Sequence, residues 1–359
     1  MSKTSSRLIF ALIGVVLFAV GIFGWAQELG GNPGATNLSD HAPWGLYIAF
    51  FLFLEVVGAG ALFFGALRRS SKLLVIGIVA AIGAAVAIIP DLGSPLLIWR
   101  LLLNPNFNAP MLLDVWFLAL NVIVGVVLLI ALKRNEALTR IFQIIQYVLA
   151  IALPLGTAWL FTTMAGKPGW GSSLEVGVFL ASAILAGFIL VNVVLKDKAA
   201  LKGVLLSAGL LLVFFLAEIG AALYAPASVE TQPMLALISG AYAWLFWGMI
   251  VVLFLLPIGW GIVTKKGGLP VAALLGLGVL VSKFLFVVKG NIYPFGRLGE
   301  GIVVPSMELD AGQAFVTYWP SGYEWLVAIG IIGFVVAAYC LLAPLGKDDA
   351  AVVAVADAA

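Results

Sequence analysis

The sequence has little charge and almost no metal-binding side chains. Only 10% of its 359 residues are charged, and it contains one cysteine, Cys340, and one histidine, His41. A four-cysteine iron–sulfur cluster, a zinc site of cysteine and histidine, a disulfide framework and a bis-histidine haem are therefore excluded within this chain. The net charge of +2 gives no support to nucleic-acid binding. Any redox chemistry has to use an organic carrier, or metals that a partner protein holds.

Apolar residues are abundant instead, at 63% of the chain against roughly 45–50% in soluble proteins. A bilayer-spanning helix needs about 20 apolar residues, and ten segments meet this requirement: 8–26, 43–67, 73–90, 111–132, 141–163, 174–195, 202–224, 234–257, 269–289 and 323–344. Lys3 and Arg7 precede the first run as in a signal peptide, but the run is long enough to span. The sequence thus predicts an all-α, polytopic protein, with residues 1–359 forming a single integral membrane domain.

Basic residues indicate the orientation of these segments. When the connections alternate between two faces, one face receives fourteen of the 19 basic residues: Lys3, Arg7, Arg68, Arg69, Lys72, Lys133, Arg134, Arg140, Lys196, Lys198, Lys202, Lys265, Lys266 and Lys347. The positive-inside rule makes this face cytoplasmic, and both termini with it. The long connections 27–42, 91–110, 164–173, 225–233 and 290–322 then lie on the outer face, where we expect the functional surface.

Ionisable residues inside the predicted spans are candidates for proton transfer, because such residues are costly in a membrane. Glu55 is interpreted either as a proton acceptor or as a carboxylate satisfied by a hydroxyl, an indole or Lys283. For Glu218, proton conduction and a structural pair with Lys283 remain equally open. Asp114 lies at the outer start of the fourth span, where a carboxylate also stabilises a helix N-terminus. The predicted proton-transfer residues are Glu55, Glu218 and Lys283.

Polar and aromatic residues near the outer face are compatible with a quinone pocket. His41 is the sole side chain whose unperturbed pKa lies near neutrality, and imidazole can donate to or accept from a quinone headgroup. The predicted quinone-binding residues are His41, Trp44, Tyr47, Asp91, Asp114 and Trp116. A polar surface role for His41, and a membrane-interface role for the aromatic rings, stay open as alternatives.

Several stretches together resemble one known family. They are LSDHAPWGLYIA at residues 38–49, PDLGSP at 90–95, APM at 109–111 with DV at 114–115, FLASAILAG at 179–187, and YWPSGYEW at 318–325. In this order and spacing they resemble the NrfD-type, or polysulfide-reductase-like, membrane subunits. The ten spans resemble the longer branch, which includes subunits of alternative complex III. Two departures stand out: Ser94 replaces a common arginine, and Glu55 lies where the family has small or apolar residues.

The resemblance implies two four-helix bundles, at residues 43–163 and 174–289, flanked by helices 8–26 and 323–344 and an outer loop 290–322. It also implies one pocket for menaquinone or ubiquinone at the outer face of the first bundle, with no metal held by this chain. An iron–sulfur subunit would dock on the outer face. A molybdenum enzyme or a multihaem cytochrome would follow it as the terminal partner. The host would be the cytoplasmic membrane of a bacterium or an archaeon.

We therefore expect a quinone-interacting membrane anchor of a respiratory oxidoreductase, with terminal catalysis in a partner and no catalytic residue in this chain. The main alternative is a secondary transporter, which ten spans and intramembrane carboxylates also suit. A purely structural anchor for a peripheral enzyme is a third possibility. Co-purifying quinone and an iron–sulfur subunit would separate the first function from the other two.

Overall fold

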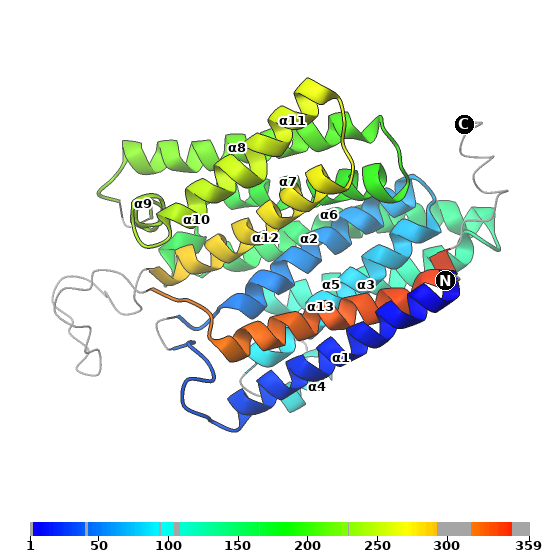
Figure 1. Ribbon diagram of the computed structural model, residues 1–359, viewed down its shortest axis with the longest axis horizontal. Helices are drawn as coiled ribbons and strands as arrows, with labels where there is room; N and C mark the ends of the chain where they lie inside the picture. Colours follow the sequence, from blue (N-terminus) through cyan, green and yellow to red (C-terminus); the bar gives the residue numbers. More distant parts are fainter. Residues whose placement is uncertain are drawn as a thin grey trace.

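All regular elements in the described part of the chain are helices. The computed structural model describes residues 3–39, 42–92, 95–103, 108–164, 166–228, 230–292 and 317–346. Within it, ten helical stretches are long and apolar enough to cross a membrane. They lie side by side with similar axis directions (Figure 1). The predicted all-α polytopic fold and the ten spans are confirmed.

The helix bounds follow the predicted segments closely. The long helices are α1 (Lys3–Leu29), α2 (Leu46–Leu67), α3 (Ser71–Ile88), α5 (Pro110–Ala131), α6 (Glu136–Thr162), α7 (Leu174–Val194), α8 (Ala200–Tyr224), α12 (Leu269–Ile292) and α13 (Gly322–Leu342). Short helices are η1 (Ile89–Asp91), η2 (Pro95–Leu97), α4 (Trp99–Leu103), η3 (Pro168–Trp170), α9 (Gln232–Ser239) and η5 (Ala343–Gly346). The remaining span combines α10 (Ala243–Gly248), the π-helical η4 (Met249–Leu255) and α11 (Leu256–Thr264).

The eighth predicted span, 234–257, is wrong in its bounds. The structure ends α9 at Ser239 and starts the spanning stretch at Ala243. Between them, the Tyr242 hydroxyl donates to the Tyr318 carbonyl at 2.7 Å and accepts from the Tyr318 amide at 2.6 Å. Gly240, a poor helix former, takes an extended conformation there. A contact 76 residues away in the chain thus overrides a continuous apolar run.

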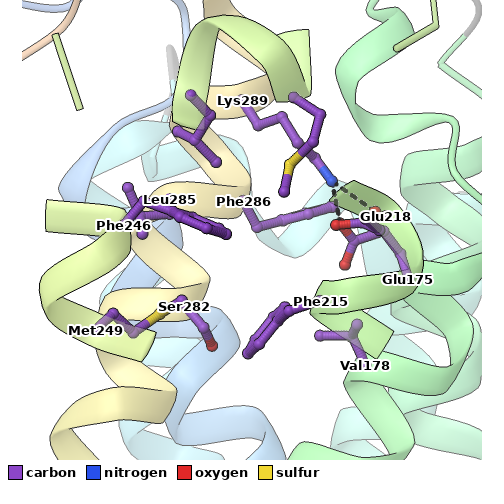
Figure 2. Close-up of a pocket in the computed structure, with 12 residues that line it drawn as sticks. Glu175, Val178, Phe215, Glu218, Phe246, Met249, Ser282, Leu285, Phe286 and Lys289 are labelled. Carbon is purple, nitrogen blue, oxygen red and sulfur yellow. Dashed lines mark hydrogen bonds and ion pairs between the residues drawn. The ribbon is translucent and has the colours of Figure 1, made fainter. Parts of the chain in front are cut away.

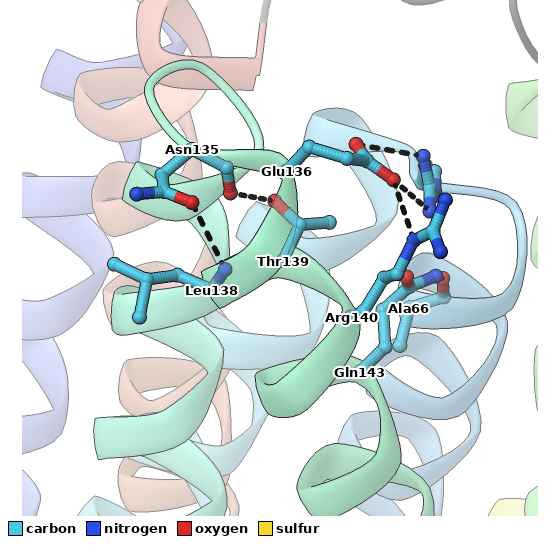
Figure 3. A network of polar contacts seen from close by, with 8 residues as sticks. Ala66, Asn135, Glu136, Leu138, Thr139, Arg140 and Gln143 are labelled. Atoms are coloured by element: carbon cyan, nitrogen blue, oxygen red, sulfur yellow. Dashed lines mark hydrogen bonds and ion pairs between the residues drawn. The ribbon is translucent and has the colours of Figure 1, made fainter.

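One end of the structure carries the short basic turns at residues 68–72, 132–136, 195–200 and 265–268, and we call it the basic end. Arg69 contacts Glu136 through two nitrogens at 2.8 and 3.1 Å, and Arg140 contacts Glu136 at 3.2 Å (Figure 3). Gln143 donates to the Ala66 carbonyl at 2.7 Å in the same region. These contacts join the end of α2 to the start of α6.

The last described residues also lie at the basic end, since Lys133 donates to the Leu345 carbonyl at 3.1 Å. Helix α1 begins at this end as well (Figure 1). The opposite end, which we call the loop end, carries longer connections, including residues 30–39, 42–45 and 166–173. The first and last described residues therefore share one side of the structure.

Small residues allow the long helices to approach closely. A Cβ atom added to Gly21 of α1 would lie 2.5 Å from the Gly330 Cα of α13, and one added to Gly14 would lie 2.7 Å from the Ala337 amide. Such packing is typical of membrane helices, which cannot rely on a hydrophobic driving force against lipid. Helix α2 is central and packs against α3, α6, α7 and α12. The division into two four-helix bundles stays a prediction.

Candidate functional site

Four helices, α1, α2, η1 and α13, and the loop before α13 bring carboxyl and tyrosine side chains together at the loop end. We define the carboxyl–tyrosine cluster as Glu28, Tyr47, Asp91, Tyr318 and Glu324. The Tyr47 hydroxyl donates to Glu28, and the Tyr318 hydroxyl donates to Glu324 at 3.0 Å. Asp91 interacts electrostatically with both Glu28 and Glu324. Tyr47 and Asp91, predicted from the sequence, are thereby brought together.

Asp91 is the chemically unusual member of this cluster. Both of its carboxyl oxygens are buried and lack a hydrogen-bond partner among the described residues. A buried polar group without a partner costs free energy, so native structures rarely leave one unpaired. The Tyr47 hydroxyl donates its one hydrogen to Glu28 but keeps acceptor capacity. The cluster can therefore accept hydrogen bonds from a bound ligand.

The position of the cluster depends on the segment before α13. Ser321 caps this helix, since its side chain accepts from the Glu324 amide at 3.1 Å while its own amide donates to the Glu324 carboxylate at 2.5 Å. The Tyr318 hydroxyl accepts from the Leu46 amide at 3.0 Å, at the start of α2. Burial, together with the nearby Glu324 charge, raises the pKa of Tyr318. Tyr318 therefore serves as a neutral hydrogen-bond donor that fixes Glu324.

A second cluster, which we call the Thr157 cluster, joins α2, α5 and α6. The Thr157 hydroxyl oxygen lies 2.6 Å from one oxygen of Glu55 and 2.6 Å from one oxygen of Asp114. Both carboxyl groups are buried. The hydroxyl also lies 3.1 Å from the Leu153 carbonyl. Because a hydroxyl carries one hydrogen, at least one of the two carboxyl contacts requires a hydrogen carried by the carboxyl group. The arrangement can hold and exchange a proton. The predicted hydroxyl partner of Glu55 is present for one oxygen, whereas the other, Oε2, has no hydrogen-bond partner among the described residues.

Lys283, on α12, lies between this cluster and α7. Its ammonium nitrogen is 3.6 Å from the centroid of the Phe179 ring, a cation–π contact. The side chain is fully buried, and its nitrogen has no hydrogen-bond partner among the described residues. Lys283 interacts electrostatically with Glu55 on α2 and with Glu175 on α7. Lys283 thus lies near Glu55, as predicted, but the described contacts include no direct ion pair between them.

Glu218 does not pair with Lys283, contrary to one of the two predicted alternatives. Its partner is Lys289, whose nitrogen lies 2.9 Å from the Glu218 carboxylate and also contacts Glu175 (Figure 2). All three side chains are almost fully buried and line a small cavity between α7, α8 and α12. We call Glu175, Glu218 and Lys289 the buried triad.

The remaining predicted residues have different surroundings. Trp44 stacks on Trp170 with ring centroids 5.0 Å apart and meets the edge of Phe161 at 5.3 Å, so its ring is part of the packed core. The buried Trp116 indole nitrogen has no hydrogen-bond partner in the described part of the chain. His41 lies outside the described residues. On the loop after α6, burial lowers the pKa of Lys167 to about 8.

Several functional candidates were not singled out from the sequence. Glu28 lies at the end of a helix that looks like a simple lipid-facing span, and Thr157 carries no charge in an apolar run. Glu324 and Glu175 did offer a signal in the pattern of residues, because each is an acid in the first turn of a span. Across the described residues, no group of three or more histidine, cysteine, aspartate or glutamate side chains could hold a metal ion.

Comparison with known proteins assigns the family. Residues 34–294 match the family described as polysulphide reductase, NrfD. The chain is 27% identical to the Hdr-like menaquinol oxidoreductase integral membrane subunit of Archaeoglobus fulgidus, over 91% of this chain and 90% of that protein. It is 28% identical to a putative dimethyl sulfoxide reductase membrane subunit of Halobacterium salinarum, over 56% of this chain and 55% of that protein.

A selenate reductase subunit of Mesobacillus selenatarsenatis is also similar, at 22% identity over 94% of this chain and 93% of that protein. The matched family region starts before α2 and ends just after α12, so it contains the Thr157 cluster and the buried triad. It leaves out all of α1 and all of α13, which supply Glu28 and Glu324. The chain belongs to the NrfD polysulphide reductase family of integral membrane subunits.

Proposed function

We propose that this chain is the quinol-reactive membrane anchor of a respiratory oxidoreductase complex. Family membership supports this proposal, as does the similarity over nine-tenths of the chain to a subunit named for menaquinol oxidation. The observation that carries it is Asp91, whose two buried carboxyl oxygens have no partner among the described residues and which interacts electrostatically with Glu324 and Glu28. A hydroquinone presents two hydroxyl donors, which such a carboxyl group can accept.

Oxidation of a quinol to a quinone releases two electrons and two protons. We assign the electrons to an iron–sulfur subunit docked at the loop end, in keeping with relatives that are named as subunits of dimethyl sulfoxide and selenate reductases. The protons pass to carboxyl groups. Asp91 is the first acceptor we assign, because neither of its oxygens has a hydrogen-bond partner within the described ranges and both can accept a hydrogen from the substrate.

Proton transfer then involves the deeper groups. The short contacts of the Thr157 hydroxyl with Glu55 and Asp114 need at least one carboxyl hydrogen, so we assign this cluster the uptake and release of protons. Lys283 lies beyond Glu55 and interacts with Glu175 of the buried triad. We assign Glu55, Asp114, Lys283 and Glu218 to this internal proton route.

The names of related proteins guide the finer assignments. Relatives named as subunits of dimethyl sulfoxide and selenate reductases support a partner arrangement in which a catalytic subunit and an electron-transfer subunit join this anchor. We favour menaquinone as the quinone, on the name of the A. fulgidus protein. The basic end faces the cytoplasm by the positive-inside rule, which places the carboxyl–tyrosine cluster on the outer side. Family membership favours this function over a secondary transporter.

Purification of the intact complex from its native membrane tests the proposal. We expect an iron–sulfur subunit and extractable quinone to co-purify, and the complex to oxidise a quinol with an artificial electron acceptor. A stable, partner-free chain without quinone that moves a solute into liposomes would contradict the proposal and support transport.

A further inference from the structure

An apolar groove runs between α1, α3 and α13 on the outside of the helix bundle. Ile22 and Trp25 line it from α1, Pro90 from the segment after α3, and Val327 and Ile331 from α13. Its volume is about 220 Å³, and its lining is almost wholly apolar. Ile22 is 50% exposed, so the groove opens sideways toward the surface that lipid covers.

Each of the three elements that form the groove carries a carboxyl group just beyond it at the loop end. Glu28 follows Trp25 by three positions on α1, Asp91 directly follows Pro90, and Glu324 precedes Val327 by three positions on α13. Positions three apart lie on one face of a helix, about one turn from each other. The groove therefore ends at the carboxyl–tyrosine cluster.

We propose that this groove holds the isoprenoid tail of a quinol whose headgroup lies in the carboxyl–tyrosine cluster. The inference rests on the function proposed above and adds the position of the tail. The combined site is elongated, apolar along its length and rich in hydrogen-bond acceptors at one end, with Asp91 unpartnered among the described residues. A neutral hydroquinone on a long apolar chain has the complementary shape and chemistry.

A phospholipid fits the same groove poorly. The carboxyl groups of Glu28, Asp91 and Glu324 at its end would repel a phosphate headgroup, and the cluster itself contains no basic side chain. A hydroquinone carries no charge, and its hydroxyl groups donate hydrogen bonds to carboxyl oxygens. The chemistry of the groove end thus selects a neutral donor over an anion.

The groove orients the tail rather than driving binding. Lipid chains are as apolar as the groove lining, so moving a tail from lipid into the groove changes little hydrophobic surface. Affinity comes from hydrogen bonds to the headgroup, and the groove fixes the direction from which a long-tailed quinol reaches the cluster. A tail-less quinol does not need the groove.

Ile22→Trp, which fills the groove from α1, tests the proposal in the intact complex. Phe23→Trp is the matched control, since Phe23 is 55% exposed on the same helix and does not line the groove. We expect Ile22→Trp to raise KM for a long-tailed quinol roughly tenfold, the scale of overpacking a bound group. KM for a tail-less quinol should remain within about twofold of wild type on the same argument, and the control should change neither.

A photoreactive group on the quinone tail gives a second, independent measurement on the wild-type complex. Labelled peptides from α1, α3 or α13 would support the proposal. Labels confined to a different apolar hollow, such as the one between α2, α6 and α7 near Gly60, Pro154 and Ile184, would overturn it. Equal KM changes for both quinols in Ile22→Trp would also overturn it. If the wild-type complex oxidises neither quinol, the proposed function itself fails, and the tail assignment with it.

Discussion

Replacement of Lys289 by methionine tests the electrostatics of the buried triad. The ammonium group contacts two carboxylates, and the side chains of Lys289, Glu175 and Glu218 are 5%, 4% and 9% exposed. Methionine has a similar length but no charge, so the variant leaves two acidic groups facing each other in a protein interior. Breaking a buried ion pair by removing one partner costs about 3–5 kcal/mol.

This loss is measurable as a shift in thermal unfolding. With an unfolding entropy of roughly 2.1 cal/mol/K per residue, a chain of this length loses about 4–7 °C in Tm for 3–5 kcal/mol. Tryptophan fluorescence of the purified protein in detergent reports the transition. Lys266→Met, at an exposed position of the basic end, is the matched control and should leave Tm unchanged.

The triple variant Lys289→Met, Glu175→Gln, Glu218→Gln completes the test. Removing all three charges takes away the uncompensated carboxylates, and replacing a whole buried ion group by neutral residues is often neutral for stability. We therefore expect the triple variant to regain most of the lost Tm. An unchanged Tm in the single variant, or a triple variant as unstable as the single one, would refute the reasoning.

Three other substitutions have defined outcomes. Thr157→Val removes the hydroxyl that joins two buried carboxyl groups. We expect slower proton release during quinol oxidation, measured with a pH-indicator dye. Unaltered proton release would exclude the Thr157 cluster from the proton route. Gly21→Leu places a side chain against the Gly330 Cα. We expect it to destabilise the α1–α13 contact by roughly 1–3 kcal/mol, which would be measured as a lower Tm. An unchanged Tm would mean that α1 can shift freely. Arg69→Gln breaks an exposed ion pair with Glu136 and should leave Tm essentially unchanged, because exposed pairs contribute little; a clear drop would show that the basic end limits stability.

Hydropathy and charge predicted the fold well because a membrane span, and the side on which it is flanked by basic residues, depend on residues that are close together in the sequence. A span needs about 20 apolar residues wherever it lies, so nine of the ten predicted segments lie close to the observed helices. The eighth failed because its start depends on a contact between Tyr242 and the distant Tyr318. The hydropathy of neighbouring residues cannot reveal a hydrogen bond to a distant residue, and it therefore cannot show where such a bond interrupts a helix.

Partner choice among buried ionisable residues was harder to predict. Lys283 and Lys289 lie six positions apart on α12, roughly 240° around the helix, so they face different neighbours. Glu218 pairs with Lys289 because of tertiary packing: α12 packs against α7 and α9, and α7 packs against α8. Thr157 shows the same limit, since its role arises from Glu55 and Asp114 on two other helices.

The central claim is that a quinol reacts at the loop end beside Asp91, and Asp91→Asn measures it most directly. The control is Asp197→Asn, which breaks an ion pair with Arg68 at the opposite, basic end. Quinol oxidation by the intact, fully assembled complex is measured for both variants. A hydrogen bond to a charged group contributes about 1.5–3 kcal/mol, so Asp91→Asn should lower kcat/KM roughly 10- to 150-fold while Asp197→Asn leaves it unchanged. Wild-type turnover in Asp91→Asn would contradict the account.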